Sequence, residues 1–377
     1  MNFVPRVSPL AYQTYRVLRD AGLPMPARLV VGVSGGPDSV ALLSLLAELR
    51  AMASLTLWGV YVNHGWRPRA AQREQVLVAQ IGRRVQVPII VVRVPARKCP
   101  RHSWEGTARD ARYAALSRVA RRVRAHAVAV GHTQEDQVET LLLALLRGAG
   151  VQGLGGMRLV RPLDAASSPP LFLIRPLLAV RHAPLTAYLR ERRLPWVMDE
   201  TNREPRFRRN QLRRTLLPWL TRQFGEQVLD RLATCAELAR EDDACLQQQV
   251  ARWVQRRVHA PSARRLPAGP VEAGRGGQAR LRTGSVRLPL PPLRRQPLAL
   301  QRRILRWAIG QVAGSLTGLT FRHVAALVAL AARGVGTVHL PHGLMAEVVA
   351  GHVGRRAVQR GHTRWQAGDL VVRYRGA

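Results

Sequence analysis

The sequence is short of the residues that mark secreted, disulfide-stabilised and membrane-spanning proteins. Its three cysteines, Cys99, Cys235 and Cys245, form no CxxC pair and no even disulfide framework. No apolar run approaches the roughly 20 residues that cross a bilayer, and the first residues lack the apolar segment of a signal peptide. These absences predict a protein of a reducing compartment, the cytoplasm, with no membrane contact.

Acidic residues are also scarce. The 377 residues include 59 basic and 23 acidic side chains, a net charge of +36, and Lys98 is the one lysine. Because 47% of the residues are hydrophobic, the chain can bury enough apolar surface for two or three folded domains. A folded protein with so positive a surface is expected to bind a polyanion.

The first 220 residues alternate short apolar runs with helical patterns. Runs rich in β-branched residues predict strands at 27–33, 55–63, 88–94, 126–132 and 171–177. Helices are predicted from Asp38 to Arg50 and from near Ala71, Glu105 and Glu135. This alternation is typical of βαβ units, so we expect an α/β fold with a doubly wound parallel sheet in residues 1–220.

The rest of the chain differs in composition. Residues 251–300 contain seven prolines, five glycines and eleven arginines against one glutamate, which predicts a loop-rich basic linker. We therefore expect a helical region with this linker at 221–297. Two helical patterns and short strand-like runs predict a small α+β region at 298–377.

The most informative segment is the loop Ser34-Gly35-Gly36-Pro37-Asp38-Ser39, which follows a buried strand and opens a helix. Its glycines let backbone N–H groups approach an anion, and the helix presents its positive end, so the loop can hold a phosphate or pyrophosphate. The lysine of a Walker P-loop is missing, which excludes most kinases and GTPases. The plainer alternative is a glycine turn that caps a helix.

A second segment, 131–140, follows a predicted strand and places His132 at its carboxyl end. In a doubly wound sheet ligands bind beyond the carboxyl ends of the strands, so this segment should lie beside the loop. Asp136 and Glu139 share one helical face, where they could bind Mg²⁺ or hold and deprotonate an amine. A capped helix with a solvated acidic first turn is the alternative.

Arginines form two further groups. Arg109 and Arg112 lie one helical turn apart beside Tyr113, and a guanidinium there could grip ATP or an amino-acid carboxylate. A stretch from Arg203 to Arg214 interleaves arginines with an aromatic ring, which suits an RNA backbone and a splayed base. The expected RNA contacts are Arg203, Arg206, Arg208, Arg209, Asn210 and Arg213. In both groups a solvated helix face is the alternative.

The loop resembles the PP-loop of ATP pyrophosphatases, and further motifs narrow the resemblance. The segments VNHGWR (62–67), 104–116, 131–157 and 199–218 are together similar to the tRNA(Ile)-lysidine synthase family. The resemblance is tight over residues 25–220 and looser beyond. One departure is Glu135-Asp136, where the family usually has two aspartates.

The resemblance implies that ATP transfers AMP to the wobble cytidine of an isoleucine tRNA with a CAU anticodon, and that the amine of free L-lysine then displaces the AMP. The implied cofactors are ATP and Mg²⁺, with Asp38 as the candidate metal ligand, and a homodimer is an open possibility. The expected ATP-binding residues are Ser34, Gly35, Gly36, Pro37, Asp38, Ser39, His64 and His132. The expected catalytic residues are Asp38, Asp136, Glu139 and Arg109. The expected lysine-binding residues are Arg109, Arg112, Asp136 and Glu139.

Three other functions share parts of this pattern. A PP-loop tRNA thiolase would need reactive or cluster-binding cysteines, and three scattered ones argue against it. An amide-forming synthetase such as GMP synthetase fits the charge of +36 poorly. A non-catalytic RNA-binding protein would not need the intact loop.

Overall fold

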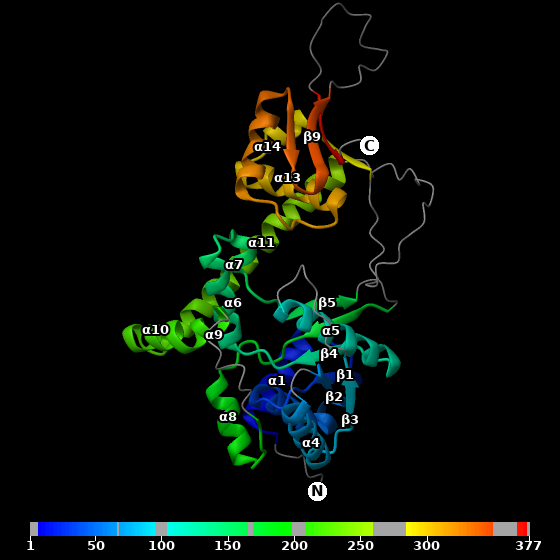
Figure 1. The fold of residues 1–377 in the computed structure, drawn as a ribbon, viewed down its shortest axis with the longest axis vertical. Helices are drawn as coiled ribbons and strands as arrows, with labels where there is room; N and C mark the ends of the chain where they lie inside the picture. The colour runs from blue at the N-terminus through cyan, green and yellow to red at the C-terminus, as the bar shows by residue number, and fades with distance from the viewer. Residues whose placement is uncertain are drawn as a thin grey trace, which may run out of the picture. The chain divides into compact units, whose positions relative to one another are not determined.

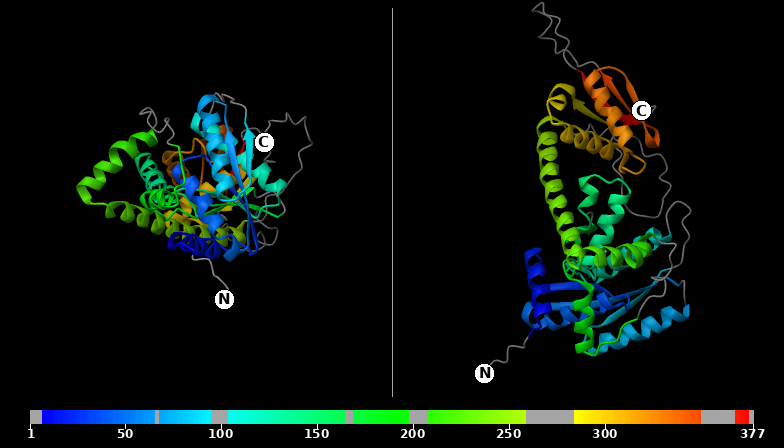
Figure 2. Two further views of the ribbon diagram at one scale, coloured as in Figure 1. Left: turned by 90° about the horizontal axis from the view of Figure 1, so that it is seen from below. Right: turned by 90° about the vertical axis from the view of Figure 1, so that its left-hand side faces the viewer.

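A computed structural model of the chain describes residues 7–65, 68–94, 104–164, 169–197, 208–258, 284–349 and 368–374. The chain divides into two compact units, Met1–Glu241 and Asp242–Ala377. The division falls inside one continuous helix, α11 (Gln227–Arg257), which Figure 2 shows along its length. The three-part division expected at 220 and 297 stays a prediction.

The first unit is built on a six-stranded sheet. Its strands are β1 (Ala27–Gly32), β2 (Leu55–Asn63), β3 (Ile89–Arg93), β4 (Ala127–Val130), β5 (Val160–Asp164) and β6 (Leu171–Ile174). Their order is β3-β2-β1-β4-β6-β5, and all neighbours pair in parallel except β5 with β6 (Figure 1). The chain first builds outward from β1 to β3 and then continues on the other side with β4. The carboxyl ends of β1 and β4 therefore meet at a topological switch point, where such sheets bind ligands.

Helices cover both faces of this sheet because successive strand residues point to opposite sides. Val31 packs with α2 (Pro37–Glu48) and α8 (His182–Glu191) on one face, whereas Val30 packs with α5 (Trp104–Arg122) on the other. The helices before the arginine stretch are α1 (Pro9–Asp20), α2 (Pro37–Glu48), α3 (Arg50–Ala53), α4 (Pro68–Arg84), α5 (Trp104–Arg122), α6 (Gln134–Leu146), α7 (Val151–Leu154) and α8 (His182–Glu191). After it come α9 (Arg208–Gln211), the π-helix η2 (Leu212–Leu216) and α10 (Leu217–Phe224). The doubly wound α/β fold predicted from the sequence is confirmed.

The second unit carries a four-stranded antiparallel sheet with helices. Its elements after α11 are β7 (Ser285–Pro289), α12 (Leu290–Arg294), α13 (Leu298–Ala313), α14 (Phe321–Arg333), β8 (Thr337–Leu340), the short 3-10 turn η3 (Pro341–Gly343), β9 (Leu344–Val349) and β10 (Asp369–Tyr374). The strand order is β7-β10-β9-β8. Leu288, Leu305, Leu330 and Leu370 are fully buried in its core. None of the helices in the described ranges of the chain is long and apolar enough to cross a membrane.

Two expectations from the sequence need correction. The loop-rich segment expected at 251–300 is wrong for its described ends, because α11 extends to Arg257 and β7, α12 and the start of α13 occupy 285–300. Prolines fit there because Pro291 lies in the first turn of α12, where a missing N–H costs nothing. Strand β5 was not predicted, because Pro162 interrupts its apolar pattern. At a sheet edge such a proline is tolerated.

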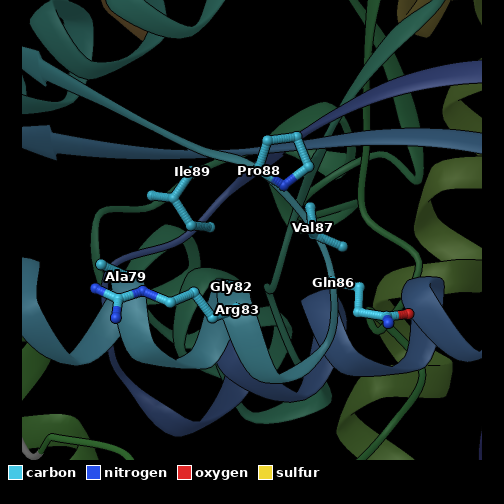
Figure 3. Close-up of a pocket in the computed structure, with 7 residues that line it drawn as sticks. All are labelled: Ala79, Gly82, Arg83, Gln86, Val87, Pro88 and Ile89. Carbon is cyan, nitrogen blue, oxygen red and sulfur yellow. The ribbon is translucent and has the colours of Figure 1, made fainter.

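A shallow notch of about 350 Å³ lies between the end of α4 and the start of β3 (Figure 3). It is lined by Ala79, Gly82, Arg83, Gln86, Val87, Pro88 and Ile89. It opens at the amino end of β3, the edge of the parallel sheet opposite to the switch point. This notch is therefore separate from the glycine loop at 34–39.

Gly131, directly after β4, allows the end of this strand to pack closely against α2. A Cβ atom built on Gly131 would lie 2.7 Å from the carbonyl oxygen of Asp38 and 3.0 Å from the backbone nitrogen of Ser39. Both contacts are with backbone, which cannot rotate away. The end of β4 therefore lies directly against the first turn of α2.

We predict that Gly131→Ala lowers the free energy of unfolding by about 1–3 kcal/mol, because the added methyl group overpacks this contact. Gly284→Ala is the control, because nothing lies within 4 Å of its Cβ position, and its cost should stay within about 0.5 kcal/mol. Urea denaturation of both variants measures the difference. Equal effects of the two substitutions would show that the close approach carries no energy.

Candidate active site

The glycine loop joins β1 to α2 at the switch point, and hydrogen bonds of two serines stabilise its conformation. Ser39 Oγ donates to the carbonyl oxygen of Gly36 at 2.9 Å and accepts from the backbone N–H of Ser34 at 3.1 Å. The two hydroxyl groups lie 3.2 Å apart. Gly35 has a φ of +87°, which favours glycine. No side chain caps the N-terminus of α2, so its first amides can bind an anion such as a phosphate.

Asp38 lies in the first turn of α2 and is held by a residue that the sequence analysis missed. Its Oδ1 is 2.6 Å from Nδ1 of His182, the first residue of α8. This hydrogen bond raises the pKa of His182 above its ordinary 6.5, against the opposing effect of partial burial. The carboxylate of Glu135 accepts from the backbone N–H of His182 at 3.0 and 3.1 Å, which fixes the start of α8. The side chain of Glu135, which is longer than that of aspartate, therefore has a structural role in holding the first turn of α8.

The two carboxylates on α6 form a four-residue cluster with two arginines. Glu139 is 0% exposed and accepts from Nε of Arg209 and Nε of Arg213, each at 2.6 Å. Asp136 Oδ1 accepts from Nη2 of the same arginines at 2.9 and 3.0 Å. Two negative charges thus meet two positive charges. Arg209 and Arg213 are four residues apart in α9 and η2, which brings both guanidinium groups to one side.

The cluster also sets the protonation of Asp136. Burial would raise the pKa of Asp136, but Arg209, His132 and Arg213 together hold it below its ordinary value. Its Oδ2 accepts from the backbone N–H of Thr133 at 3.0 Å and completes a capping box at the start of α6. Asp136 therefore stays ionised. Its carboxylate also stabilises the N-terminus of α6, in addition to any role in catalysis.

His132 follows β4 and lies between this cluster and the arginine after β6. Nε of Arg175 donates to Nδ1 of His132 at 3.3 Å. Burial lowers the pKa of His132 to about 4, and Arg175 contributes to that lowering against the charge of Asp136. His132 is therefore neutral at physiological pH.

The candidate residues on α5 form a cationic neighbourhood. The guanidinium of Arg109 lies 5.6 Å from the centre of the Tyr113 ring, and that of Arg161 lies 4.9 Å from it. Burial would raise the pKa of Tyr113, but the nearby arginines lower it. Burial and the charge of Arg112 lower the pKa of His64. A site with this excess of positive charge favours an anionic ligand.

The structure therefore brings together most of the expected site residues. The loop, His132, Asp136 and Glu139 gather around the carboxyl ends of β1 and β4, and Arg109 and Arg175 both influence His132. Arg209 and Arg213 were expected on a surface that faces RNA, whereas the structure places them on the buried carboxylates. Cys99, Arg203 and Arg206 lie outside the described residues, as does the side chain of Arg208.

Sequence reasoning missed Arg175 and His182. Arg175 directly follows β6, and His182 begins the next helix. The strand predicted at 171–177 was the one signal in this region, but it placed Arg175 inside the strand and left the position of that strand in the sheet open.

Comparison with known proteins agrees with this geometry. A family model described as a PP-loop domain matches residues 9–220, and a model described as the TilS substrate binding domain matches residues 288–377. The U34-tRNA thiolase NcsA from Methanococcus maripaludis has a similar fold, with a TM-score of 0.50 and 14% identity. That likeness covers 62% of this chain and 78% of the thiolase. The fold and the loop thus define a PP-loop protein.

Curated relatives narrow the family. A tRNA(Ile)-lysidine synthase from Salinispora tropica is 37% identical over 325 residues, which cover 85% of this chain and 88% of the relative. The chain belongs to the tRNA(Ile)-lysidine synthase family. Another, from Symbiobacterium thermophilum, is 36% identical over 89% of this chain and 66% of its own length. A third, from Solibacter usitatus, is 34% identical over 82% of this chain. The chain spans 66% and 62% of the lengths of these last two relatives.

The carboxylate cluster predicts strong coupling between Glu139 and Arg213. Each single substitution, Glu139→Gln or Arg213→Met, leaves buried charge without its full set of partners and should lower the free energy of unfolding. The double variant should lose less than the sum of the two, by about 1–3 kcal/mol. Urea denaturation of the four proteins gives this coupling.

The exposed pair of Arg19 and Asp20 provides the matched control. Both side chains are more than half exposed, so the same cycle with Arg19→Met and Asp20→Asn should give a coupling below about 0.5 kcal/mol. Additive effects of Glu139→Gln and Arg213→Met would show that the two side chains do not stabilise each other.

The contact between His182 and Asp38 predicts a dependence of stability on pH. A raised pKa means that the folded protein binds the proton more tightly than the unfolded chain. The contribution of His182 is therefore fully present below about pH 6.5 and is lost as the pH rises through the raised value. The difference in melting temperature between the wild type and His182→Asn should shrink over this range. A difference that grows with pH would have the wrong sign.

Proposed function

We propose that the chain forms lysidine in tRNA. ATP transfers AMP to the O2 atom of the wobble cytidine in an isoleucine tRNA with a CAU anticodon, and pyrophosphate leaves. The ε-amine of free L-lysine then attacks C2 and displaces AMP. The observation that carries this proposal is the phosphate loop at the switch point of a chain that belongs to this enzyme family.

The loop supports the first step. Departing pyrophosphate gains negative charge, and the uncapped amides of α2 are fixed donors for it. Gly131 keeps β4 close, so His132 reaches the same region. Arg109 and Arg112 add positive charge beside the site, and we assign them to the carboxylate of lysine or the phosphates of ATP.

The carboxylate cluster limits how the amine is bound. We assign Asp136 or Glu139 to hold and deprotonate the ε-amine, but Arg209 and Arg213 occupy oxygens of both carboxylates in the described arrangement. The incoming ammonium must therefore replace at least one guanidinium. This exchange preserves the charge balance of the buried site.

Mg²⁺ is the expected companion of ATP, and the carboxylates differ in how well they fit it. The arginines neutralise Asp136 and Glu139, whereas Asp38 lies in the loop itself beside the place of the phosphates. Mg²⁺ usually takes one or two carboxylates together with substrate phosphates and waters, so we assign it to Asp38. When bound, it would neutralise charge on the pyrophosphate.

The RNA is the expected polyanionic partner. The net charge of +36 and the match of residues 288–377 to the TilS substrate binding domain support tRNA binding by the second unit. A base in a single-stranded anticodon loop is inexpensive to unstack, which makes it accessible to the site. ATP, lysine and tRNA are all available in the cytoplasm, where we place the enzyme.

The direct test is pyrophosphate release from ATP with an unmodified isoleucine tRNA transcript that carries CAU. Release should require the transcript, and lysine should sustain turnover. Asp38→Ala should reduce release about 100-fold or more while RNA affinity changes by less than about threefold, because the substitution removes charge from the ATP site. Asp20→Ala, an exposed change on α1, should leave both unchanged. Equal loss of RNA binding in Asp38→Ala would contradict its assignment.

A further inference from the structure

Arg175 is a buried arginine whose hydrogen bonds reach the candidate site. Its side chain is 2% exposed, and Nη1 donates to the carbonyl oxygen of Arg158 at 2.5 Å. Its Nε donates to Nδ1 of His132 at 3.3 Å. Burying a charged group is costly unless hydrogen bonds compensate for the lost water, so these two contacts hold the guanidinium in place.

The contact determines which nitrogen of His132 carries the proton. A guanidinium has donors and no acceptor, and it does not lose its proton at physiological pH. Nδ1 of His132 must therefore be the unprotonated, accepting nitrogen. The neutral ring then carries its hydrogen on Nε2.

The surroundings of His132 oppose a second proton. Burial, Arg175, Arg209 and Arg109 all disfavour the imidazolium, and Asp136 is the acidic group that acts in the other direction. The ring is thus a neutral group with one accepting nitrogen already occupied and one N–H to offer.

We propose that Arg175 is a positioning residue that commits His132 to donate a hydrogen bond through Nε2 rather than to accept a proton. This inference rests on the proposed function. In AMP transfer, the bond from cytidine O2 to the α-phosphorus forms, and the bond to the bridging oxygen breaks, with its electron pair leaving on pyrophosphate. A fixed neutral donor suits the phosphate oxygens that gain charge in this step.

The assignment also restricts the second step. The new bond joins the lysine nitrogen to C2, the bond from C2 to the AMP oxygen breaks, and the amine must lose a proton. Because neither nitrogen of His132 is a free acceptor, that proton goes to another group. Asp136 of α6 is the carboxylate whose charge acts on His132, and it is the group that we assign to take this proton.

The tautomer can be read without any enzymatic activity. In protein labelled with 15N-histidine, the two ring-nitrogen shifts distinguish an Nε2–H ring from an Nδ1–H ring and from imidazolium. His132→Gln identifies the signals of His132 among the 11 histidines by subtraction. At pH 7.5 the wild type should show the Nε2–H tautomer. An Nδ1–H ring or an imidazolium at His132 would overturn the proposal whether or not the Arg175 variants fold.

Variants then test whether Arg175 is the cause. Arg175→Lys retains a charged donor and should retain the tautomer, whereas Arg175→Met removes the donor and should give a mixture of tautomers. Arg50→Met is the control, because the guanidinium of Arg50 donates to the backbone carbonyl oxygens of Val85 and Gln86 after α4. Its His132 spectrum should match the wild type. An unchanged tautomer in Arg175→Met would show that Arg175 does not set it.

Kinetics connect the tautomer to the reaction. Arg175→Met should lower kcat for pyrophosphate release about 10–100-fold, with KM for ATP changed less than about threefold, and Arg175→Lys should restore most of kcat. A purely structural role of Arg175 would not lower kcat while KM for ATP stays nearly unchanged, and Arg175→Lys would not then restore kcat. If the wild type releases no pyrophosphate, the proposed function fails, and the spectrum still decides the tautomer.

Discussion

The buried negative charge of α6 is the constraint around which the site is arranged. Glu139 is fully buried and Asp136 nearly so, and a carboxylate in such a place must be paired or lose its charge. Arg209 and Arg213 provide the pairing, which draws the arginine stretch onto the sheet domain. The two arginines therefore balance the charge of these carboxylates, and their expected contact with RNA stays a prediction.

Backbone packing provides the second condition, because a phosphate loop works only if its amides are held in place. The contact of Gly131 with Asp38 and Ser39 joins the end of β4 to the first turn of α2. His182 and Glu135 extend this support from α8 and α6 to the side chain of Asp38. Residues that follow β1, β4 and β6 thus meet at one edge of the sheet. This explains why residues far apart in sequence can contact one ligand.

The parts of this arrangement that are local in sequence could be predicted, and the others could not. Strands β1 to β4 and the loop follow from apolar runs and glycines, and the charge pair of Asp136 and Glu139 follows from helical spacing. Composition does not reveal whether an arginine faces solvent or a buried carboxylate, so the pairing of Arg209 with Asp136 and Glu139 was not predicted. His182 and Arg175 depend on the position of β6 in the sheet, which the one-dimensional pattern leaves open.

The central claim is that these groups together modify a cytidine with lysine. Its most direct measurement is the mass of the wobble nucleoside after incubation of the CAU transcript with the enzyme, ATP and isotopically labelled lysine. The account predicts cytidine that carries one labelled lysyl group and has lost one oxygen to AMP. Unmodified cytidine, or a product without the label, would contradict it.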